Sequence, residues 1–226
     1  SRRLAQILLA PDVRPVGRAG THNKGSDMKQ ILGLLAVGLL VGLSPARAAS
    51  ISPISYDMNN GHGQASGGSF NYWDRSYTGL GATTTDDAPL SGGKGDLTDG
   101  IAASDFWYNV ENNAGTGPYV GWYSVVRRDP SILFNFADTP TISEVRVHLD
   151  NSGAGGVFQP LAFLVNGQSW AFTPLAPGAI GWITLTGAAV TGNALSLTLV
   201  HQPFSHWIFG SEVQFDGTPG TSVPDP

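Results

Sequence analysis

Residues 161–172 read LAFLVNGQSWAF, and this stretch decides the fold. Two apolar-rich runs, 161–165 and 168–172, flank the dipeptide Asn166-Gly167. Asn-Gly supplies the positive φ angles that a two-residue type I′ turn requires, so the stretch predicts a β-hairpin. We therefore expect a domain built from antiparallel strands.

The rest of the second half supports this expectation with further short apolar runs. In 142–150 (ISEVRVHLD), three apolar residues alternate with polar ones, which is the period of a half-buried strand. Turn-forming residues separate these runs. The predicted strands are 131–136 (SILFNF), 142–150, 182–186 (WITLT), 195–200 (LSLTLV) and 212–216 (EVQFD).

The first half contains more loop sequence. Residues 78–100 are polar and glycine-rich, and a long loop inside a compact domain is usually functional or mobile. No stretch after residue 50 keeps a 3.6-residue apolar period, so we expect no helix there. Many short strands then predict an all-β fold, an antiparallel β-sandwich. The strands expected in this half are 55–58, 70–73, 106–110 and 119–126.

Residues 28–48 have the pattern of a signal peptide. Met28 and Lys29 precede an uninterrupted apolar run, 31–43, and a small-residue cleavage site ends at Ala48. The run is shorter than the roughly 20 residues that a spanning helix needs. A buried helix of the domain is the alternative. We expect export, and a secreted or cell-surface location.

The remaining boundaries follow from this segment. We expect residues 1–27 to be non-native upstream sequence without order, although a basic nucleic-acid-binding arm is the alternative. Residues 49–217 would form the sandwich domain, and 218–226 a disordered tail.

Charge and cysteine content exclude several functions. After Ala48 the chain has five basic and fifteen acidic residues, a net charge of −10, which disfavours nucleic-acid binding and suits cations. The chain has no cysteine, so thiolate zinc sites and cysteine nucleophiles are excluded.

Two short motifs carry a family resemblance. Residues 95–100 (GDLTDG) precede Trp107, and residues 210–215 (GSEVQF) lead into the final predicted strand and carry a glutamate, Glu212. This pattern resembles the discoidin, or coagulation-factor type C, domain and more broadly the galactose-binding-like jelly roll of carbohydrate-binding modules. The resemblance covers roughly residues 54–217.

The resemblance implies a structural calcium ion near the Asp-Gly turn. It points to Asp99 and Glu212 as ligands, with Asp96 and Ser104 as weaker candidates. Calcium takes six to eight hard oxygen ligands, and glycine-rich turns can present carbonyl oxygens. Alternatively, Asp99 only caps the turn through its own backbone.

The tail carries a second resemblance. Val223-Pro224-Asp225-Pro226 is similar to the opening of the PEP-CTERM sorting signal of Gram-negative bacteria, with Asp225 in place of glutamate. The resemblance implies a membrane anchor beyond residue 226 and association with exopolysaccharide at the cell surface. A proline-rich disordered tail is the alternative.

Aromatic residues in loops are the second candidate site. Sugars stack their apolar faces on Trp or Tyr rings while neighbouring polar groups bind the hydroxyls. For any single ring a place in the core is the favoured alternative, because sandwich cores use tryptophan heavily. The predicted carbohydrate-binding residues are Trp73, Asp74, Arg75, Tyr77, Tyr119, Trp122, His206 and Trp207.

Catalytic signatures are absent from the sequence. There is no G-x-S-x-G motif, and Asp86-Asp87 lie side by side in a loop, which does not fix the separation that a glycosidase needs. His62, His148, His201 and His206 lack metal-binding spacing and are expected mostly at the surface. We expect a non-catalytic module that binds glycan or exopolysaccharide. The alternatives are a self-assembling matrix protein and, less favoured, a hydrolase.

Overall fold

The computed structural model describes residues 48–220. The upstream segment, almost all of the signal peptide and the tail motif at 223–226 lie outside these residues. Within residues 48–220 no helix is long and apolar enough to cross a membrane.

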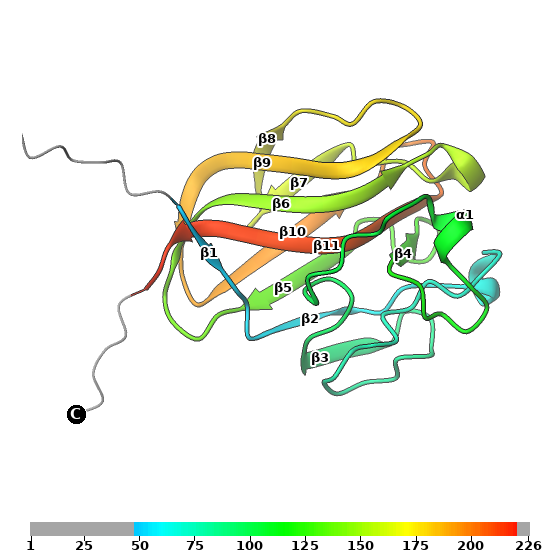
Figure 1. The fold of residues 1–226 in the computed structure, drawn as a ribbon, viewed down its shortest axis with the longest axis horizontal. Helices are drawn as coiled ribbons and strands as arrows, with labels where there is room; N and C mark the ends of the chain where they lie inside the picture. Colours follow the sequence, from blue (N-terminus) through cyan, green and yellow to red (C-terminus); the bar gives the residue numbers. More distant parts are fainter. Residues whose placement is uncertain (1–47, 221–226) are drawn as a thin grey trace, which may run out of the picture. The chain divides into compact units, whose positions relative to one another are not determined.

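The described residues form an antiparallel β-sandwich, as predicted. One layer contains β1, β11, β6 and β9, and the other contains β7, β10, β5, β2 and β3; β8 pairs with both β9 and β7, and β4 pairs with β11. Figure 1 shows β6, β9 and β11 lying over β5, β7 and β10. The strands are β1 (Ala49–Ile51), β2 (Ser55–Asn59), β3 (Pro89–Gly93), β4 (Val120–Tyr123), β5 (Ser131–Asn135), β6 (Thr141–Asn151), β7 (Ala162–Val165), β8 (Gln168–Phe172), β9 (Ala179–Thr191), β10 (Ala194–Val200) and β11 (Trp207–Thr218).

The predicted hairpin is present as β7 and β8. Asn166 and Gly167 have φ angles of 48° and 77°, the left-handed conformation that the type I′ turn requires. Phe163 pairs with Trp170 across the hairpin, and both side chains are buried. Here the turn residues and the apolar period specify the same register.

The core lies between the two layers. Alternate residues of β6 (Val145, Val147 and Leu149) point inward and are buried, as the apolar period predicts. Leu195, Leu197 and Leu199 of β10 face them from the other layer. Full burial of one such side chain contributes about 1.5–3 kcal/mol to the stability of the fold.

Two strand predictions were wrong. Residues 106–110 form a short helix, α1 (Trp107–Val110), whose first turn is held by carboxylates outside it. Asp150 accepts from the N–H of Trp107, and Asp105 accepts from the N–H of Phe106 and from the Asn109 side chain. Residues 70–73 form a loop and not a strand. Tyr72 donates one backbone hydrogen bond to His62 and accepts one from Gly121, so the loop joins these two segments without forming a strand ladder. Two 3-10 turns, η1 (Gln64–Ser66) and η2 (Ala154–Gly156), lie in other loops.

The polar stretch 78–100 is partly a strand. It contains β3, and the loop before β3 is tied to its surroundings by side chains. Trp73 Nε1 donates to Asp86 Oδ1 at 2.7 Å, and the Arg127 guanidinium donates two hydrogen bonds to the Asp87 carboxylate at 2.8 and 2.9 Å. The adjacent acids Asp86 and Asp87 therefore anchor this loop.

Candidate functional site

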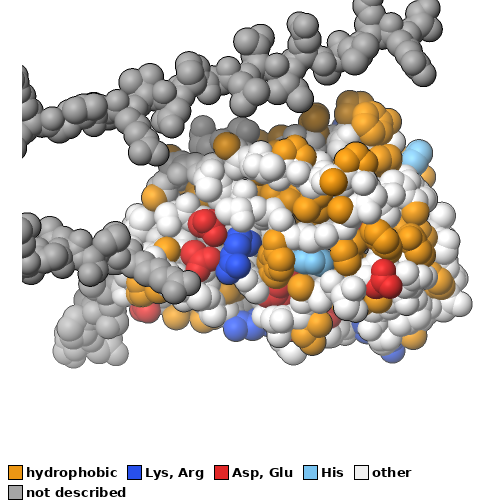
Figure 2. Space-filling view, turned by 45° about the horizontal axis from the view of Figure 1, so that its top comes forward, with side chains coloured by type: hydrophobic (Ala, Val, Ile, Leu, Met, Phe, Trp, Pro, Cys, Tyr) orange, Lys and Arg blue, Asp and Glu red, His pale blue; other side chains and the backbone are white. Residues whose placement is uncertain are grey.

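The loops at one end of the sandwich form the candidate site. There β6 ends at Asn151 opposite the start of β9, and β10 ends at Val200 opposite the start of β7. The connections 152–161, 173–178 and 201–206 therefore meet at this end, which lies to the right in Figure 1. Figure 2 shows hydrophobic side chains gathered toward the same end.

These loops enclose a pocket of about 410 Å³, which we call the loop-end pocket. Its residues come from three separate connections and are brought together only by the fold. They are Asn151, Ser152, Gly153, Phe158, Gln159, Pro174, Leu175, Pro177, Gly178, Gln202 and Phe204.

One wall of the pocket is aromatic. The rings of Phe158 and Phe204 pack edge to face, with centroids 5.4 Å apart and planes at 87°. Phe204 is 64% exposed, so much of its surface is open to a ligand. Proline and leucine side chains of the 173–178 connection also line the pocket and add apolar surface.

Three amide side chains line the same pocket. Asn151 is fully engaged: its Nδ2 donates to the carbonyls of Leu175 and Ala176, and its Oδ1 accepts from the N–H of Gln159. This network holds the 173–178 connection against the end of β6. Hydrogen bonds therefore hold one wall of the pocket in place.

Gln159 and Gln202 each use only one of their two side-chain amide atoms in a hydrogen bond within the described residues. Gln159 Oε1 accepts from the N–H of Leu175 at 2.8 Å, and Gln202 Nε2 donates to the carbonyl of Gln159 at 2.8 Å. Gln159 Nε2 and Gln202 Oε1 make no hydrogen bond to the part of the chain that the structure describes. One amide donor and one amide acceptor thus remain available at the pocket, beside Ser152 Oγ, which also has no partner among the described residues.

Three of the predicted carbohydrate-binding rings lie in the interior, which contradicts a stacking role for them. Tyr77, Tyr119 and Trp122 are 6%, 0% and 1% exposed. Trp122 Nε1 donates to the carbonyl of Asn59, and the Tyr119 hydroxyl donates to the carbonyl of Asp105. These rings fill space between loops and sheet, so their surfaces are covered by protein.

Trp207 is also mostly buried. It packs with Tyr72, Trp107 and Phe209 in a second aromatic cluster, with centroids 5.1 Å from Tyr72 and 5.5 Å from Phe209. Trp207 lines a small cavity of about 80 Å³. The ring therefore stabilises the loop end and leaves little room for a sugar.

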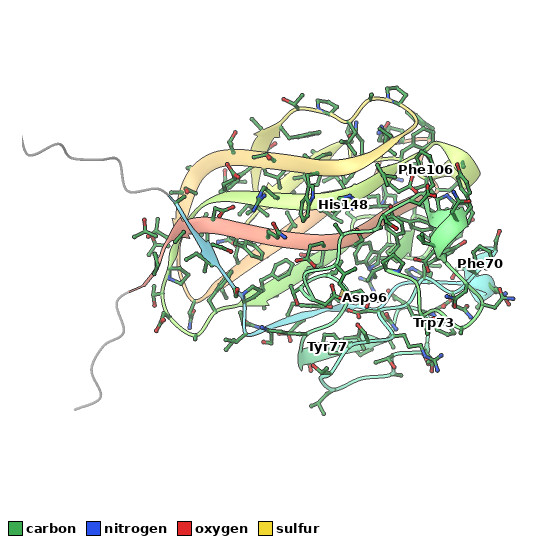
Figure 3. All side chains as sticks on the ribbon, in the orientation of Figure 1. Phe70, Trp73, Tyr77, Asp96, Phe106 and His148 are labelled. Carbon is green, nitrogen blue, oxygen red and sulfur yellow. The ribbon has the colours of Figure 1, made fainter. Side chains whose placement is uncertain are left out.

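The other four predicted residues range from fully buried to exposed. Asp74 is fully buried and accepts hydrogen bonds from the Tyr56 hydroxyl and the Asp96 N–H. Trp73 is half-buried, whereas Arg75 and His206 are exposed. Figure 3 places Trp73 toward the loop end, and Tyr77 and Asp96 nearer the middle of the domain.

The predicted calcium ligands divide between two depressions. Asp99 and Glu212 line one of about 310 Å³, and Asp99 lines another of about 370 Å³ with Asp96 and Ser104. Glu212 is buried and its Oε2 accepts from the N–H of Gly100 at 3.1 Å. In residues 48–220 no three His, Asp or Glu side chains are placed to hold a metal ion together.

The predicted ligands nevertheless carry oxygen atoms, which are the donors that calcium prefers. Burial raises the pKa of Glu212 to about 7, with Asp99 adding to the rise, because the carboxylate has lost water. Burial also raises the pKa of Asp96 to about 7, with Asp74 as a second cause. A cation would favour the charged forms, but carbonyl oxygens and water would have to complete its shell.

Three histidines are buried, against the expectation of surface positions. His62 Nδ1 accepts from the N–H of Tyr123 at 3.2 Å, and a ring nitrogen of His148 contacts Ser211 Oγ at 2.8 Å. Burial lowers the pKa of His201 to about 4. Burial also lowers the pKa of His62 and of His148. Among the four histidines of residues 48–220, only His206 is exposed.

The sequence reasoning missed Phe158, Gln159, Gln202 and Phe204. No motif or spacing marks them, since they lie on loops about forty residues apart in the sequence. The available signal was weak: Asn151 and Gln202 are amide residues placed just after apolar strand patterns. Recognising the pocket required knowing that these strands end side by side.

A comparison with protein-family models matches part of this chain. The model described as the discoidin domain-containing receptor 1/2, DS-like domain, matches residues 53–167, about half of the chain. No curated protein sequence matches the chain.

Several solved structures show a distant likeness. A chain of the Streptococcus pneumoniae β-galactosidase BgaA has 12% identity over 75% of this chain and 98% of its own, with a TM-score of 0.44. An S. pneumoniae fucose-binding module has 11% identity over 65% and 96%, with a TM-score of 0.37. An f-lectin (fucolectin) from striped bass (Morone saxatilis) serum has 9% identity over 74% and 73%, with a TM-score of 0.40.

Proposed function

The chain belongs to the family described as the discoidin domain-containing receptor 1/2, DS-like domain, and from this premise we propose that it is a non-catalytic module that binds carbohydrate in the loop-end pocket. The observation that supports the proposal is the combination of an exposed ring and two half-engaged amides in one pocket. Phe204 offers an apolar surface, and Gln159 and Gln202 offer a donor and an acceptor.

This combination suits a sugar for physical reasons. A pyranose presents an apolar C–H face and a rim of hydroxyl groups, and proteins bind it with aromatic rings beside fixed polar groups. The pocket volume of about 410 Å³ lies within the usual range for small-ligand sites. The amide network at Asn151 holds the wall in place before a ligand arrives, which limits the ordering cost of binding.

The composition of the pocket supports a binding role without catalysis. Hydrolysis of a glycosidic bond ordinarily uses a pair of carboxyl groups on either side of it. Among the described residues that line the loop-end pocket, none is acidic. The pocket therefore offers no general acid or base to a bound sugar.

We also propose that a structural calcium ion is held by Asp99 and Glu212 with backbone carbonyl oxygens. Asp99 and Glu212 line one depression beside the Asp-Gly turn, and the buried carboxylate of Glu212 lacks a compensating cation in the described residues. An ion present at one hundred times its dissociation constant would add about 2.7 kcal/mol of stability.

Thermal unfolding in calcium and in EDTA tests this ion. We expect calcium to raise the midpoint by several degrees in the native protein and to have no effect in Glu212→Gln. Equal midpoints of the native protein in calcium and EDTA would rule out the site.

We further propose that the protein is exported and acts at the cell surface, in contact with exopolysaccharide. The support is the apolar run at 31–43 with its basic start and small-residue end. N-terminal sequencing of the protein produced with residues 28–226 in a Gram-negative host tests the export step. We expect a mature chain that begins at Ala49, and an uncleaved chain in the cytoplasm would contradict it.

Binding in the pocket is tested by calorimetry against a panel of neutral glycans. Phe204→Ala removes the exposed ring, and we expect affinity about tenfold weaker, since an aromatic contact contributes on the order of 1 kcal/mol or more. Leu80→Ala is the matched control because Leu80 is also an exposed apolar side chain, 77% exposed, and does not line the pocket.

The control variant should bind as the native protein does. Equal weakening by both variants would count against the pocket. No heat with any glycan, together with filaments or lattices formed without sugar, would instead favour a self-assembling matrix protein.

A further inference from the structure

The residues of the loop-end pocket favour one class of sugar over others. We propose that it recognises the acetamido group of a neutral N-acetylated sugar, an N-acetylhexosamine. This inference rests on the proposed function of the same pocket, and it names the substituent that the pocket selects.

The first argument is the pair of unused hydrogen-bonding atoms. Gln159 commits its Oε1 to the N–H of Leu175, which leaves its NH₂ group as a donor. Gln202 commits its NH₂ group to the carbonyl of Gln159, which leaves its Oε1 as an acceptor. An acetamido group has one carbonyl acceptor and one N–H donor, so it complements this pair.

The same hydrogen bonds keep the two amides adjacent and oriented. Gln202 bonds to the backbone of Gln159, so the two residues are joined directly. Gln159 is 9% exposed, and its side chain is tied to the 173–178 connection through Leu175. An ordered donor beside an ordered acceptor discriminates better than flexible surface groups do, because less freedom is lost on binding.

The second argument is the apolar surface beside the amides. Phe158 and Phe204 meet edge to face, and Pro174 and Pro177 line the same pocket. The methyl of an acetamido group needs such a surface, whereas a bare hydroxyl gains nothing from it. One extra methyl in an apolar pocket is worth roughly tenfold in affinity.

The third argument is the absence of charge. Among the described residues that line the pocket, none is charged. Asp150, next to Asn151, is fully buried, and its two oxygens accept from the N–H groups of Trp107 and Ser152 at 2.9 and 2.6 Å. A free amino sugar would bring an ammonium, and a uronic acid a carboxylate, without a partner of opposite charge.

Four methyl glycosides test the inference: glucose, glucosamine and N-acetylglucosamine, which differ only at C2, and glucuronic acid, which differs from glucose only at C6. We expect the N-acetylated sugar to bind at least tenfold more tightly than glucose by calorimetry or NMR titration, and the two charged sugars to bind most weakly. Equal affinity for glucose and N-acetylglucosamine would overturn the acetamido inference and leave carbohydrate binding standing. No binding of any of the four, or of a wider glycan panel, would overturn both.

Gln159→Glu supplies an independent test within the pocket. The variant keeps an oxygen that can accept from Leu175 and replaces the free donor by a carboxylate oxygen. We expect the preference for N-acetylglucosamine over glucose to fall at least tenfold and the affinity for glucosamine to rise, with a thermal melt to verify folding. An unchanged preference in a folded variant would contradict the assigned donor, and the ligand series on the native protein decides the inference if the variant does not fold.

Discussion

Glu111 gives a prediction that can be worked through from the structure. Glu111 is 7% exposed, its Oε1 accepts from the N–H of Tyr119 at 2.8 Å, and its Oε2 has no partner among the described residues. Burial raises the pKa of Glu111 from 4.5 to about 8, because the charged form has lost water and gains only one hydrogen bond; Asp96 adds a smaller rise. The group is therefore mostly protonated in the folded protein at pH 7.

The sign of the pH dependence follows from this shift. A carboxyl group with a raised pKa in the folded state stabilises the fold fully below pH 4.5, and the stabilisation is lost as pH rises through about 8. One pKa unit corresponds to about 1.4 kcal/mol, so the full range is on the order of 5 kcal/mol. Between pH 6 and pH 8 the loss due to Glu111 alone is about 2 kcal/mol.

Glu111→Gln isolates this contribution. The variant keeps an oxygen for the Tyr119 N–H and cannot ionise, so its free energy of unfolding should gain about 2 kcal/mol relative to the native protein between pH 6 and pH 8. Urea unfolding of both proteins across this range measures the difference. A difference that does not change with pH would refute the reasoning that Glu111 is held neutral by burial.

Three further predictions concern the fold. Trp122→Ala should lower the free energy of unfolding by about 3–5 kcal/mol in denaturant titrations, because the ring is 1% exposed and its removal leaves a cavity; a loss below about 1 kcal/mol would contradict its place in the core. Gly61→Ala should lower the melting temperature sharply, since a Cβ would lie 1.8 Å from the carbonyl oxygen of Tyr72; an unchanged melting curve would show that this close approach is absent. His201→Gln should flatten the acid side of the stability profile, because the lowered pKa of about 4 means that His201 stabilises the fold above pH 6.5 and loses this effect as pH falls through 4; parallel acid profiles of variant and native protein would contradict this.

The fold was predictable where local pattern and turn chemistry agreed. The hairpin predicted at 161–172 and the alternating strand predicted at 142–150 are both present, the second as β6 (Thr141–Asn151), because each carries its own period and boundary residues. The strand prediction for 106–110 was wrong because Phe106, Trp107 and Tyr108 favour strands in general, whereas the carboxylates of Asp105 and of the distant Asp150 hold the first turn of a helix there.

The site was less predictable than the fold. An aromatic residue in a loop can stack on a ligand or fill the core, and the sequence does not separate these roles for Tyr119 or Trp122. The pocket depends on three connections that come together only when the strands pair. Phe204 and Gln202 could be selected only after the end of β10 was placed beside β6 and β9.

The central claim is that carbohydrate binds in the loop-end pocket, and NMR mapping of ¹⁵N-labelled protein during titration with N-acetylglucosamine tests it most directly. We predict that the amide resonances of residues 151–159, 175–178 and 202–204 shift together and saturate with one dissociation constant. Shifts confined to Trp73, Arg75 and their neighbours, or no shift at any amide, would contradict the account.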